Sequence, residues 1–278
     1  MPALPHHLLI CPVCGLALLH AGRTLACASG HRFDAARQGY FNLLTGRGSP
    51  FEGDTTEMVD AREEFLGSGH YAPLRRAVVA AACRHVAAPA VALDAGAGTG
   101  YYLAGLADGI PDLFPVALDI SKVALRRAAR RLPGGISIVW DVWRPLPLAD
   151  DSVDVLVNVF APRNTGEFVR VLAPRGCVVV VTPRPGHLAG LEAVGPLLSV
   201  PDHKADDVLA AFDGELVEAA REELDYVMSL PADLARSALV MGPAARHERA
   251  TGSTTTSTSS VPLEVSARFT VQVLVSAH

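Results

Sequence analysis

VALDAGAGTGYY, residues 91–102, combines an apolar strand, a glycine-rich turn and the start of a helix within twelve positions. Glycines at 96, 98 and 100 allow the backbone to pass close to a ligand and allow the helix to pack against the strand. Asp94 stands two positions before the first of these glycines. The stretch therefore predicts the ligand-binding turn of an α/β domain.

Short apolar strands alternate with helix-length segments after this turn. A helix is expected over residues 74–86, and further strands are expected at 115–119, 136–140, 153–159 and 178–182. Such alternation implies a mostly parallel sheet that helices cover on both faces. Toward the C-terminus the pattern predicts a strand at 222–230, a helix at 231–241 and a long alternating strand at 263–275.

The glycine spacing also bears on the cofactor. Dinucleotide-binding turns usually carry GxGxxG around a pyrophosphate, whereas this turn carries GxGxG. S-adenosylmethionine has no phosphate, so the turn, with Gly96, Gly98, Thr99 and Gly100, favours that methyl donor over NAD. Asp119 ends the next expected strand and is placed to accept the ribose hydroxyls, and Asp141 follows the third strand near the adenine edge. The alternative for both aspartates is a helix-capping or turn role.

Cysteine and histidine residues near the N-terminus have the spacing of metal ligands. Cys11 and Cys14 form a CxxC pair, and Cys27 and His31 follow after twelve intervening residues. Two chelating turns of this kind predict one structural zinc ion with four protein ligands. Ordinary buried thiols are the alternative. The remaining cysteines, Cys83 and Cys177, are expected in the core.

Composition and charge limit the function classes. Half of the 278 residues are apolar, 19% are charged and the net charge is −5, which is a globular composition. No apolar run is long enough to cross a bilayer, and clustered cysteines favour a reduced, cytoplasmic protein with no membrane partner. Nucleic-acid-binding proteins are usually basic. Two groups of basic residues moderate that objection: Arg23, Arg32, Arg37 and Arg47, and Lys122, Arg126, Arg127, Arg130 and Arg131.

Several blocks of the chain resemble a known family. The blocks are CPVC, RFDAARQGYFNLL, EMVDAREEFLGSGHYAPLR, LDAGAGTGYYL, LDISKVALRRAARR, DVWRPLPL, NVFAPRN and TPRPGHL. Their order and spacing resemble the 23S rRNA guanine-N1 methyltransferases, with the FAPRN run similar to the actinobacterial macrolide-resistance branch. The resemblance implies a zinc-ribbon domain that helps to recognise an rRNA hairpin, a class I seven-stranded Rossmann-like methyltransferase domain, and a homodimer. It also implies that Tyr71 and His187 contact the cofactor.

The expected organisation has three parts. Residues 1–45 form the zinc-binding, RNA-recognition domain, residues 46–72 a linker, and residues 73–278 the methyltransferase domain. The Thr/Ser tract at 251–260 departs from the family pattern and is expected to be a flexible loop.

The catalytic residues remain open at the level of the sequence. Asn158, Asn164 and the loop between them follow the fourth strand and could hold a flipped base, or they could only shape a turn. His187, Glu167 and Asp141 are candidates for the base that removes the guanine N1 proton. A competing hypothesis is a small-molecule S-adenosylmethionine-dependent enzyme of an antibiotic pathway on the same scaffold. Another is a zinc-ribbon adaptor with an inactive methyltransferase domain.

Overall fold

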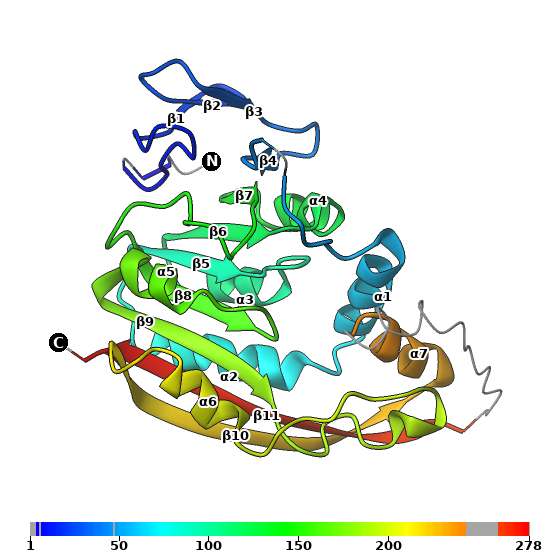
Figure 1. The fold of residues 1–278 in the computed structure, drawn as a ribbon. Coiled ribbons are helices and arrows are strands. Elements are labelled where there is room, and N and C mark those ends of the chain that lie inside the picture. Colours follow the sequence, from blue (N-terminus) through cyan, green and yellow to red (C-terminus); the bar gives the residue numbers. More distant parts are fainter. Residues whose placement is uncertain (1–3, 6, 47, 243–260, 278) are drawn as a thin grey trace.

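The fold of the chain is organised around two β-sheets (Figure 1). The computed structural model describes residues 4–5, 7–46, 48–242 and 261–277. Near the N-terminus, β1 (Leu19–Ala21), β2 (Thr24–Ala26) and β3 (Arg32–Asp34) form a small antiparallel sheet. The larger sheet has the strand order β10-β11-β9-β8-β5-β6-β7-β4.

The larger sheet is mostly parallel, which confirms the predicted fold class. Its strands are β4 (Phe41–Asn42), β5 (Ala90–Ala95), β6 (Leu113–Asp119), β7 (Ile136–Val139), β8 (Val153–Val159), β9 (Leu172–Pro183), β10 (Leu216–Leu230) and β11 (Leu263–Ser276). Strands β4 to β9 pair in parallel, while β11 runs antiparallel to both β9 and β10. The carboxyl ends of the parallel strands therefore meet at one edge, where open α/β sheets bind their ligands.

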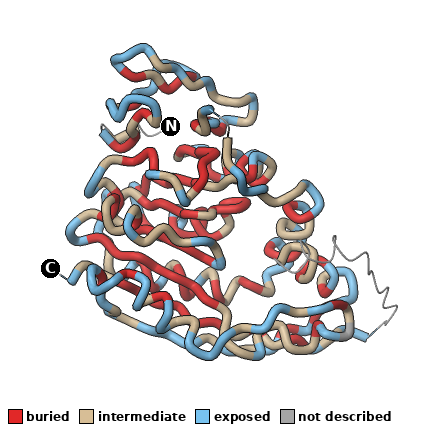
Figure 2. The backbone as a smooth tube through the Cα atoms, viewed as in Figure 1, coloured by how far each residue is buried: buried red, intermediate tan, exposed pale blue. Residues whose placement is uncertain are grey.

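Helices cover both faces of this sheet. They are α1 (Thr56–Gly67), α2 (Ala72–Cys83), α3 (Tyr101–Gly109), α4 (Lys122–Arg131), α5 (Thr165–Val171), α6 (Lys204–Ala210) and α7 (Ala232–Val240), with a 3-10 turn η1 at Leu191–Ala193. Helices α2, α3 and α4 pack on one face, and α5 and α6 pack on the other. The central strands between them are almost continuously buried (Figure 2).

The N-terminal module, which contains β1 to β4, packs against the edge of the larger sheet. Among the described residues, 73–278 supply the seven strands that we expected, and Phe41 and Asn42 add an eighth by pairing in parallel with β7. The backbone N–H of Ile10 donates to Pro147 O at 3.1 Å, and the N–H of Ala149 donates to Leu8 O at 3.0 Å. Leu8, Leu9, Leu18 and Leu25 are buried in the same core cluster as Trp140 and Leu148. Burying a leucine contributes about 1.5–3 kcal/mol, so the docking is a stable part of the fold.

Cys177 is buried as expected, but Cys83 is exposed because it lies at the C-terminal end of α2. The Thr/Ser tract at 251–260 lies outside the described residues. The boundaries at 45 and 72 stay predictions, although α1, within the expected linker, packs against α4 and α7.

Candidate functional site

The four predicted metal ligands converge at the N-terminal module. One ligand atom from each of Cys11, Cys14, Cys27 and His31 lies within 4.8 Å of the other three. His31 Nδ1 lies 3.6 Å from Cys11 Sγ and 3.4 Å from Cys27 Sγ, and the sulfurs of Cys14 and Cys27 are 3.7 Å apart. Ligands about 2.0–2.3 Å from a tetrahedral zinc ion lie roughly 3.5–3.8 Å from one another. The separations among Cys11, Cys14, Cys27 and His31, the metal quartet, therefore fit a tetrahedral zinc ion.

The backbone around the quartet favours the turns and the thiolate form that zinc binding requires. Gly15 and Gly30 follow the cysteines with φ angles of +73° and +85°, a backbone region that glycine adopts readily. The Cys14 thiol group accepts a hydrogen bond from the backbone N–H of Leu16. This hydrogen bond is the main cause that lowers the pKa of Cys14 to about 6. Thiolates are the form of cysteine that binds zinc. Four protein ligands leave no open position, so this zinc would be structural.

The glycine-rich turn lies between β5 and α3. Gly96, Gly98 and Gly100 all have positive φ angles, of 93°, 52° and 76°. A Cβ atom at Gly96 would clash with the Cβ of Ala161, and one at Gly100 would lie 3.1 Å from Leu132 Cδ1. The turn therefore needs glycine both for its backbone angles and for its close contacts.

Asp119 fixes this turn to the end of β6. Its Oδ2 accepts the backbone N–H of Gly98 at 2.8 Å, and its Oδ1 accepts the N–H of Ser121 at 2.7 Å. Burial is the main cause that raises the pKa of Asp119. Each carboxylate oxygen has a second lone pair, so Asp119 can hold the turn and still accept a ligand hydroxyl.

Asp94 and Asp141 are the two buried acids of the predicted site, whereas Asp119 is half-buried. Asp94 lines the cavity beside the turn, and burial, followed by the charge of Asp119, raises the pKa of Asp94 to about 8. Asp141 Oδ2 accepts from the Ser49 hydroxyl at 2.7 Å, and its Oδ1 accepts from the Trp143 backbone at 3.0 Å. Asp141 thus shapes a turn and also ties the chain at Ser49 to the end of β7.

An aromatic group closes the other side of this cavity. The Tyr71 hydroxyl lies 3.2 Å from His187 Nε2, and the Phe160 ring centre lies 6.5 Å from that of Tyr71 and 6.3 Å from that of His187. Phe160 follows β8 with a φ of +53° and is 43% exposed. Backbone strain of this kind at a non-glycine residue is frequent at functional sites.

The loop after β8 is held in place by Asn158 and Asn164. The buried Asn158 amide donates to Ala95 O at 2.9 Å and to Pro162 O at 3.0 Å, and its Oδ1 accepts from Arg163 at 3.2 Å. Asn164 precedes α5 but makes no side-chain cap there; its amide donates to Val142 O at 3.1 Å. Both asparagines therefore use their amides to position the loop.

Comparison with protein families matches both parts of the chain. The N-terminal family described as "RlmA, N-terminal", a zinc ribbon, matches residues 9–46, which contain the whole quartet. A methyltransferase domain family matches residues 92–176, which contain the glycine-rich turn and β8.

Similarity to known proteins extends over almost the full chain. A 23S rRNA (guanine(748)-N(1))-methyltransferase of Streptomyces fradiae is 43% identical over 240 residues, which cover 86% of this chain and 85% of that protein. A relative from Micromonospora griseorubida, named for the same guanine-N1 reaction, is 46% identical, with 88% of each chain covered. The chain belongs to the 23S rRNA guanine-N1 methyltransferase family. The methyltransferase domain of this family is S-adenosylmethionine-dependent, so NAD is excluded as the cofactor.

Solved structures agree with the fold assignment. A methyltransferase in complex with the Haloferax volcanii Trm112 activator is 18% identical, with a TM-score of 0.51 over 82% of this chain and 100% of that one. The YcgJ protein of Bacillus subtilis is 15% identical, with a TM-score of 0.50 over 73% of this chain and 98% of that one. These likenesses support the Rossmann-like methyltransferase fold of the family member.

The three candidates for a general base are all engaged in other contacts. His187 Nδ1 accepts the backbone N–H of Arg268 at 3.2 Å, so the neutral ring carries its proton on Nε2 and donates to Tyr71. Glu167 is paired with Arg170 at 2.6 Å and also accepts the N–H of Leu146. Asp141 is engaged as described above. Each of the three is therefore held by hydrogen bonds within the protein, and the geometry singles out none of them as the general base.

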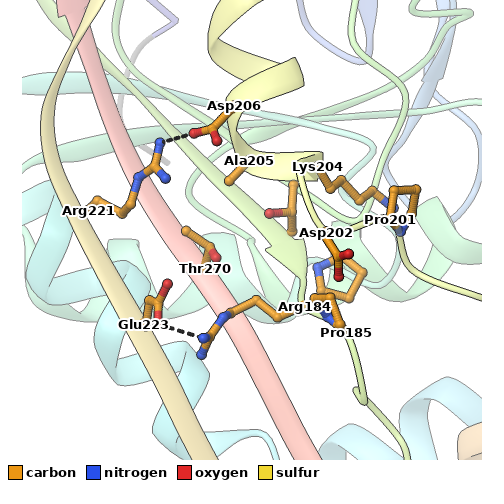
Figure 3. Close-up of a pocket in the computed structure, with 12 residues that line it drawn as sticks. Arg184, Pro185, Pro201, Asp202, Lys204, Ala205, Asp206, Arg221, Glu223 and Thr270 are labelled. Atoms are coloured by element: carbon orange, nitrogen blue, oxygen red, sulfur yellow. Dashed lines mark hydrogen bonds and ion pairs between the residues drawn. The ribbon is translucent and has the colours of Figure 1, made fainter.

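A second cavity lies at the carboxyl end of β9 (Figure 3). Its volume is about 230 Å³, against about 50 Å³ for the cavity beside the glycine-rich turn. Arg184 is paired with Glu223 at 2.6 Å, and Arg221 is paired with Asp206 at 2.7 Å. Most of its charges are thus compensated inside the protein, and we assign it no ligand.

The basic residues divide into paired and unpaired groups. On α4, Arg127 pairs with Asp60 at 2.6 Å and Arg131 pairs with Glu63 at 2.9 Å, so these two arginines bind α1. On the N-terminal module, Arg32 and Arg37 are exposed, and neither forms an ion pair with any described residue. Arg47 lies outside the described residues.

The sequence did not draw attention to two residues of the cofactor cavity. Arg62 of α1 and Tyr102 of α3 both line it. Arg62 lies in the segment that we expected to be a linker, so nothing in the sequence indicated that it lies at the cofactor. Tyr102 resembles an ordinary core residue of its helix. Contact between α1 and the turn depends on the tertiary fold.

Proposed function

We propose that this protein transfers a methyl group from S-adenosylmethionine to N1 of a guanine in a 23S rRNA hairpin. The observation that carries the proposal is the identity of 43–46% with guanine-N1 methyltransferases over a span that includes both the zinc ribbon and the methyltransferase domain. A small-molecule enzyme would have no evident need for the ribbon.

The proposed cofactor site uses the carboxyl edge of the sheet. Gly96, Gly98, Thr99 and Gly100 form its floor, Asp119 accepts the ribose hydroxyls, and Asp141 lies toward the adenine edge. Tyr71 and His187 support the opposite wall, and Asp94 faces the methionyl ammonium. Support comes from the burial of Asp94 and Asp141, from the half-buried position of Asp119, and from the convergence of β5, β6 and β7. The cavity of about 50 Å³ covers only the part of this proposed site around Asp94, Gly98 and Phe160.

The target guanine would enter beside Phe160. This ring is exposed at the rim of the cavity, and aromatic side chains stack on unpaired RNA bases. Asn158 and Asn164 act as positioning residues, since their amides hold the loop that carries Phe160. The sulfonium of S-adenosylmethionine is already an activated methyl donor, so catalysis consists mainly of placing N1 in line with the methyl group in a dry site.

Radiolabelled methyl transfer tests this proposal against the small-molecule alternative. The purified protein is given labelled S-adenosylmethionine with 23S rRNA transcripts in one reaction and with a panel of small metabolites in another. We expect label in the RNA only. Label in a metabolite and none in RNA would favour the antibiotic-pathway enzyme, and no transfer to any substrate would favour the adaptor.

Oligomeric state and cellular role extend the proposal. We propose a homodimer on the basis of the family resemblance, with the edge strand β10 as a surface with no further strand partner among the described residues. Light scattering on the eluted peak of a sizing column would give twice the chain mass. Among the described helices, none is long and apolar enough to cross a bilayer. An rRNA substrate and a reduced thiol quartet support a cytoplasmic location, and a change in macrolide susceptibility on expression would test the resistance role.

A further inference from the structure

Two buried hydrogen-bond donors in the cofactor cavity have no partner. The Nε of Arg62 and the hydroxyl of Tyr102 are both buried, and neither forms a hydrogen bond with a described residue. Both side chains line the cavity beside Gly96 and Gly98. Leaving a buried polar group unpaired costs about 1–3 kcal/mol, so unpaired donors in a binding cavity point to an acceptor on the ligand.

Two hydrogen bonds fix the position of the Arg62 side chain. Its Nη2 donates to Asp54 Oδ2 at 2.6 Å and to Met241 O at 2.8 Å. Its Cδ would lie 3.7 Å from a Cβ atom at Gly98, so the side chain lies across the glycine-rich turn. These contacts use one end of the guanidinium and leave the Nε edge without a partner.

Helix α1 itself is anchored to the same turn. Glu63 pairs with Arg131 at 2.9 Å, and Arg131 in turn donates to Thr99 O at 2.6 Å. On the next position of α1, Glu64 accepts from the Ser237 hydroxyl of α7 at 2.6 Å. Arg62 is therefore carried by a helix whose distance from the turn is held by its neighbours.

The charges around the cavity suit the methionyl end of the cofactor. Arg62 is the one cationic side chain among the described residues that line it, and Asp94 is the one acid. The methionyl group carries one carboxylate and one ammonium. A guanidinium N–H donates a charge-assisted hydrogen bond to a carboxylate, and an aspartate accepts from an ammonium.

We infer that Arg62 and Tyr102 bind the carboxylate of the methionyl part of S-adenosylmethionine. Nε of Arg62 and the hydroxyl of Tyr102 each donate to that carboxylate. Asp54 keeps the guanidinium at the rim of the cavity. The inference concerns cofactor binding alone, so it does not depend on which RNA is methylated.

Calorimetry with a pair of ligands tests the inference directly. S-adenosylhomocysteine carries the carboxylate, whereas decarboxylated S-adenosylhomocysteine differs only by its loss. We expect the wild-type protein to bind the decarboxylated ligand about 10- to 100-fold more weakly, the range for hydrogen bonds to a charged group. Arg62→Ala should weaken the binding of S-adenosylhomocysteine by a similar factor and leave the affinity for the decarboxylated ligand nearly unchanged. Tyr102→Phe should lower the affinity for S-adenosylhomocysteine by a smaller factor.

A matched control separates the carboxylate from the placement of α1. Arg127→Ala removes the ion pair between α4 and Asp60 of α1 without touching the cavity. It should leave the affinities for both ligands unchanged. Thermal unfolding and zinc content of each variant verify that the fold is intact. If Arg62→Ala lowers the affinities for both ligands by the same factor, or lowers neither, the carboxylate is bound elsewhere and the inference is wrong.

Discussion

The Nε2 atom of His187 lies 3.2 Å from the hydroxyl oxygen of Tyr71, although 116 positions separate the two residues. Nδ1 of the same ring accepts from the backbone N–H of Arg268 at 3.2 Å. Burial, followed by the charge of Lys204, lowers the pKa of His187 to about 4. The ring is therefore neutral at physiological pH, and it joins Tyr71, the N-cap of α2, to the segment that follows β9.

This pairing makes the stability of the fold depend on pH. Because the folded-state pKa of His187 is about 4 and an unfolded histidine has one near ~6.5, the unfolded chain takes up the proton first. The stabilising contribution is present above pH ~6.5 and is lost as the pH falls toward ~4. Between pH 7 and pH 5 the wild-type protein should lose about 2 kcal/mol more unfolding free energy than His187→Asn, which cannot titrate. Urea unfolding at both pH values measures the difference, and equal losses would contradict the account.

The metal quartet leads to a stoichiometric prediction. Freshly purified protein should contain one zinc per chain, and Cys11→Ala should lose it, since metal binding supplies folding free energy to a module this small. The exposed Cys83 offers a matched control, because Cys83→Ala removes a thiol outside the quartet and should retain full zinc. Elemental analysis of the three proteins decides the point. Equal zinc in both variants, or none in the wild type, would rule out this site.

Loss of zinc should also lower the stability of the methyltransferase domain. The module supplies β4 at the sheet edge and buries Leu8 and Leu9 against the core. We expect Cys11→Ala to lower the melting temperature of the whole protein by several degrees, as a loss of about 1–2 kcal/mol does. Cofactor affinity should change little, because the glycine-rich turn follows the interior strand β5.

Cofactor affinity should depend on Gly98 and Asp119. Gly98→Val would place a branched side chain at a φ of +52° beside Arg62, which is strained whatever ligand is bound. Asp119→Ala removes the acceptor for the ribose and for the Gly98 backbone, at a cost of about 1.5–3 kcal/mol. The exposed Asp207 of α6 provides the control Asp207→Ala. Calorimetry that finds wild-type affinity in both test variants would place the cofactor elsewhere.

The proposed RNA contacts predict a defined salt dependence. If Arg32 and Arg37 neutralise phosphates, each contributes roughly 0.7–0.9 to the slope of log affinity against log salt. The double change to glutamine should flatten that slope and leave cofactor binding intact. The control is Arg76→Gln on α2 with Arg84→Gln at its C-cap, because α2 lies well away from the module (Figure 1). An unchanged slope in the first variant would mean that these arginines only solvate the module.

Local sequence patterns were sufficient for most of the fold. The apolar run of β8 matched its predicted bounds, Val153–Val159, because a buried parallel strand needs apolar residues at nearly every position. The quartet and the glycine-rich turn were also readable, since their chemistry fixes both residue type and spacing. These are short-range constraints.

Long-range contacts were not predictable from the residues alone. The pairing of β4 with β7 depends on an edge strand about a hundred positions away, and a two-residue strand leaves no periodic pattern. Arg62 reaches the cofactor cavity only through the packing of α1. Cys83 was expected in the core, but the end of α2 turns it outward. A role for Tyr71 and His187 beside the cofactor was expected only from the family resemblance, and the contact between the two residues was not expected.

Mapping the methylated position tests the central claim most directly. A 23S rRNA hairpin transcript is incubated with the protein and S-adenosylmethionine, digested to nucleosides and analysed by mass spectrometry, and the site is located by primer extension. A methyl group on guanine N1 blocks the base-pairing edge, so extension should stop at a single guanine of the hairpin. The account predicts 1-methylguanosine, one stop, and loss of both in Gly98→Val. Methylation at another atom or at scattered guanines, or an unmodified hairpin, would contradict it.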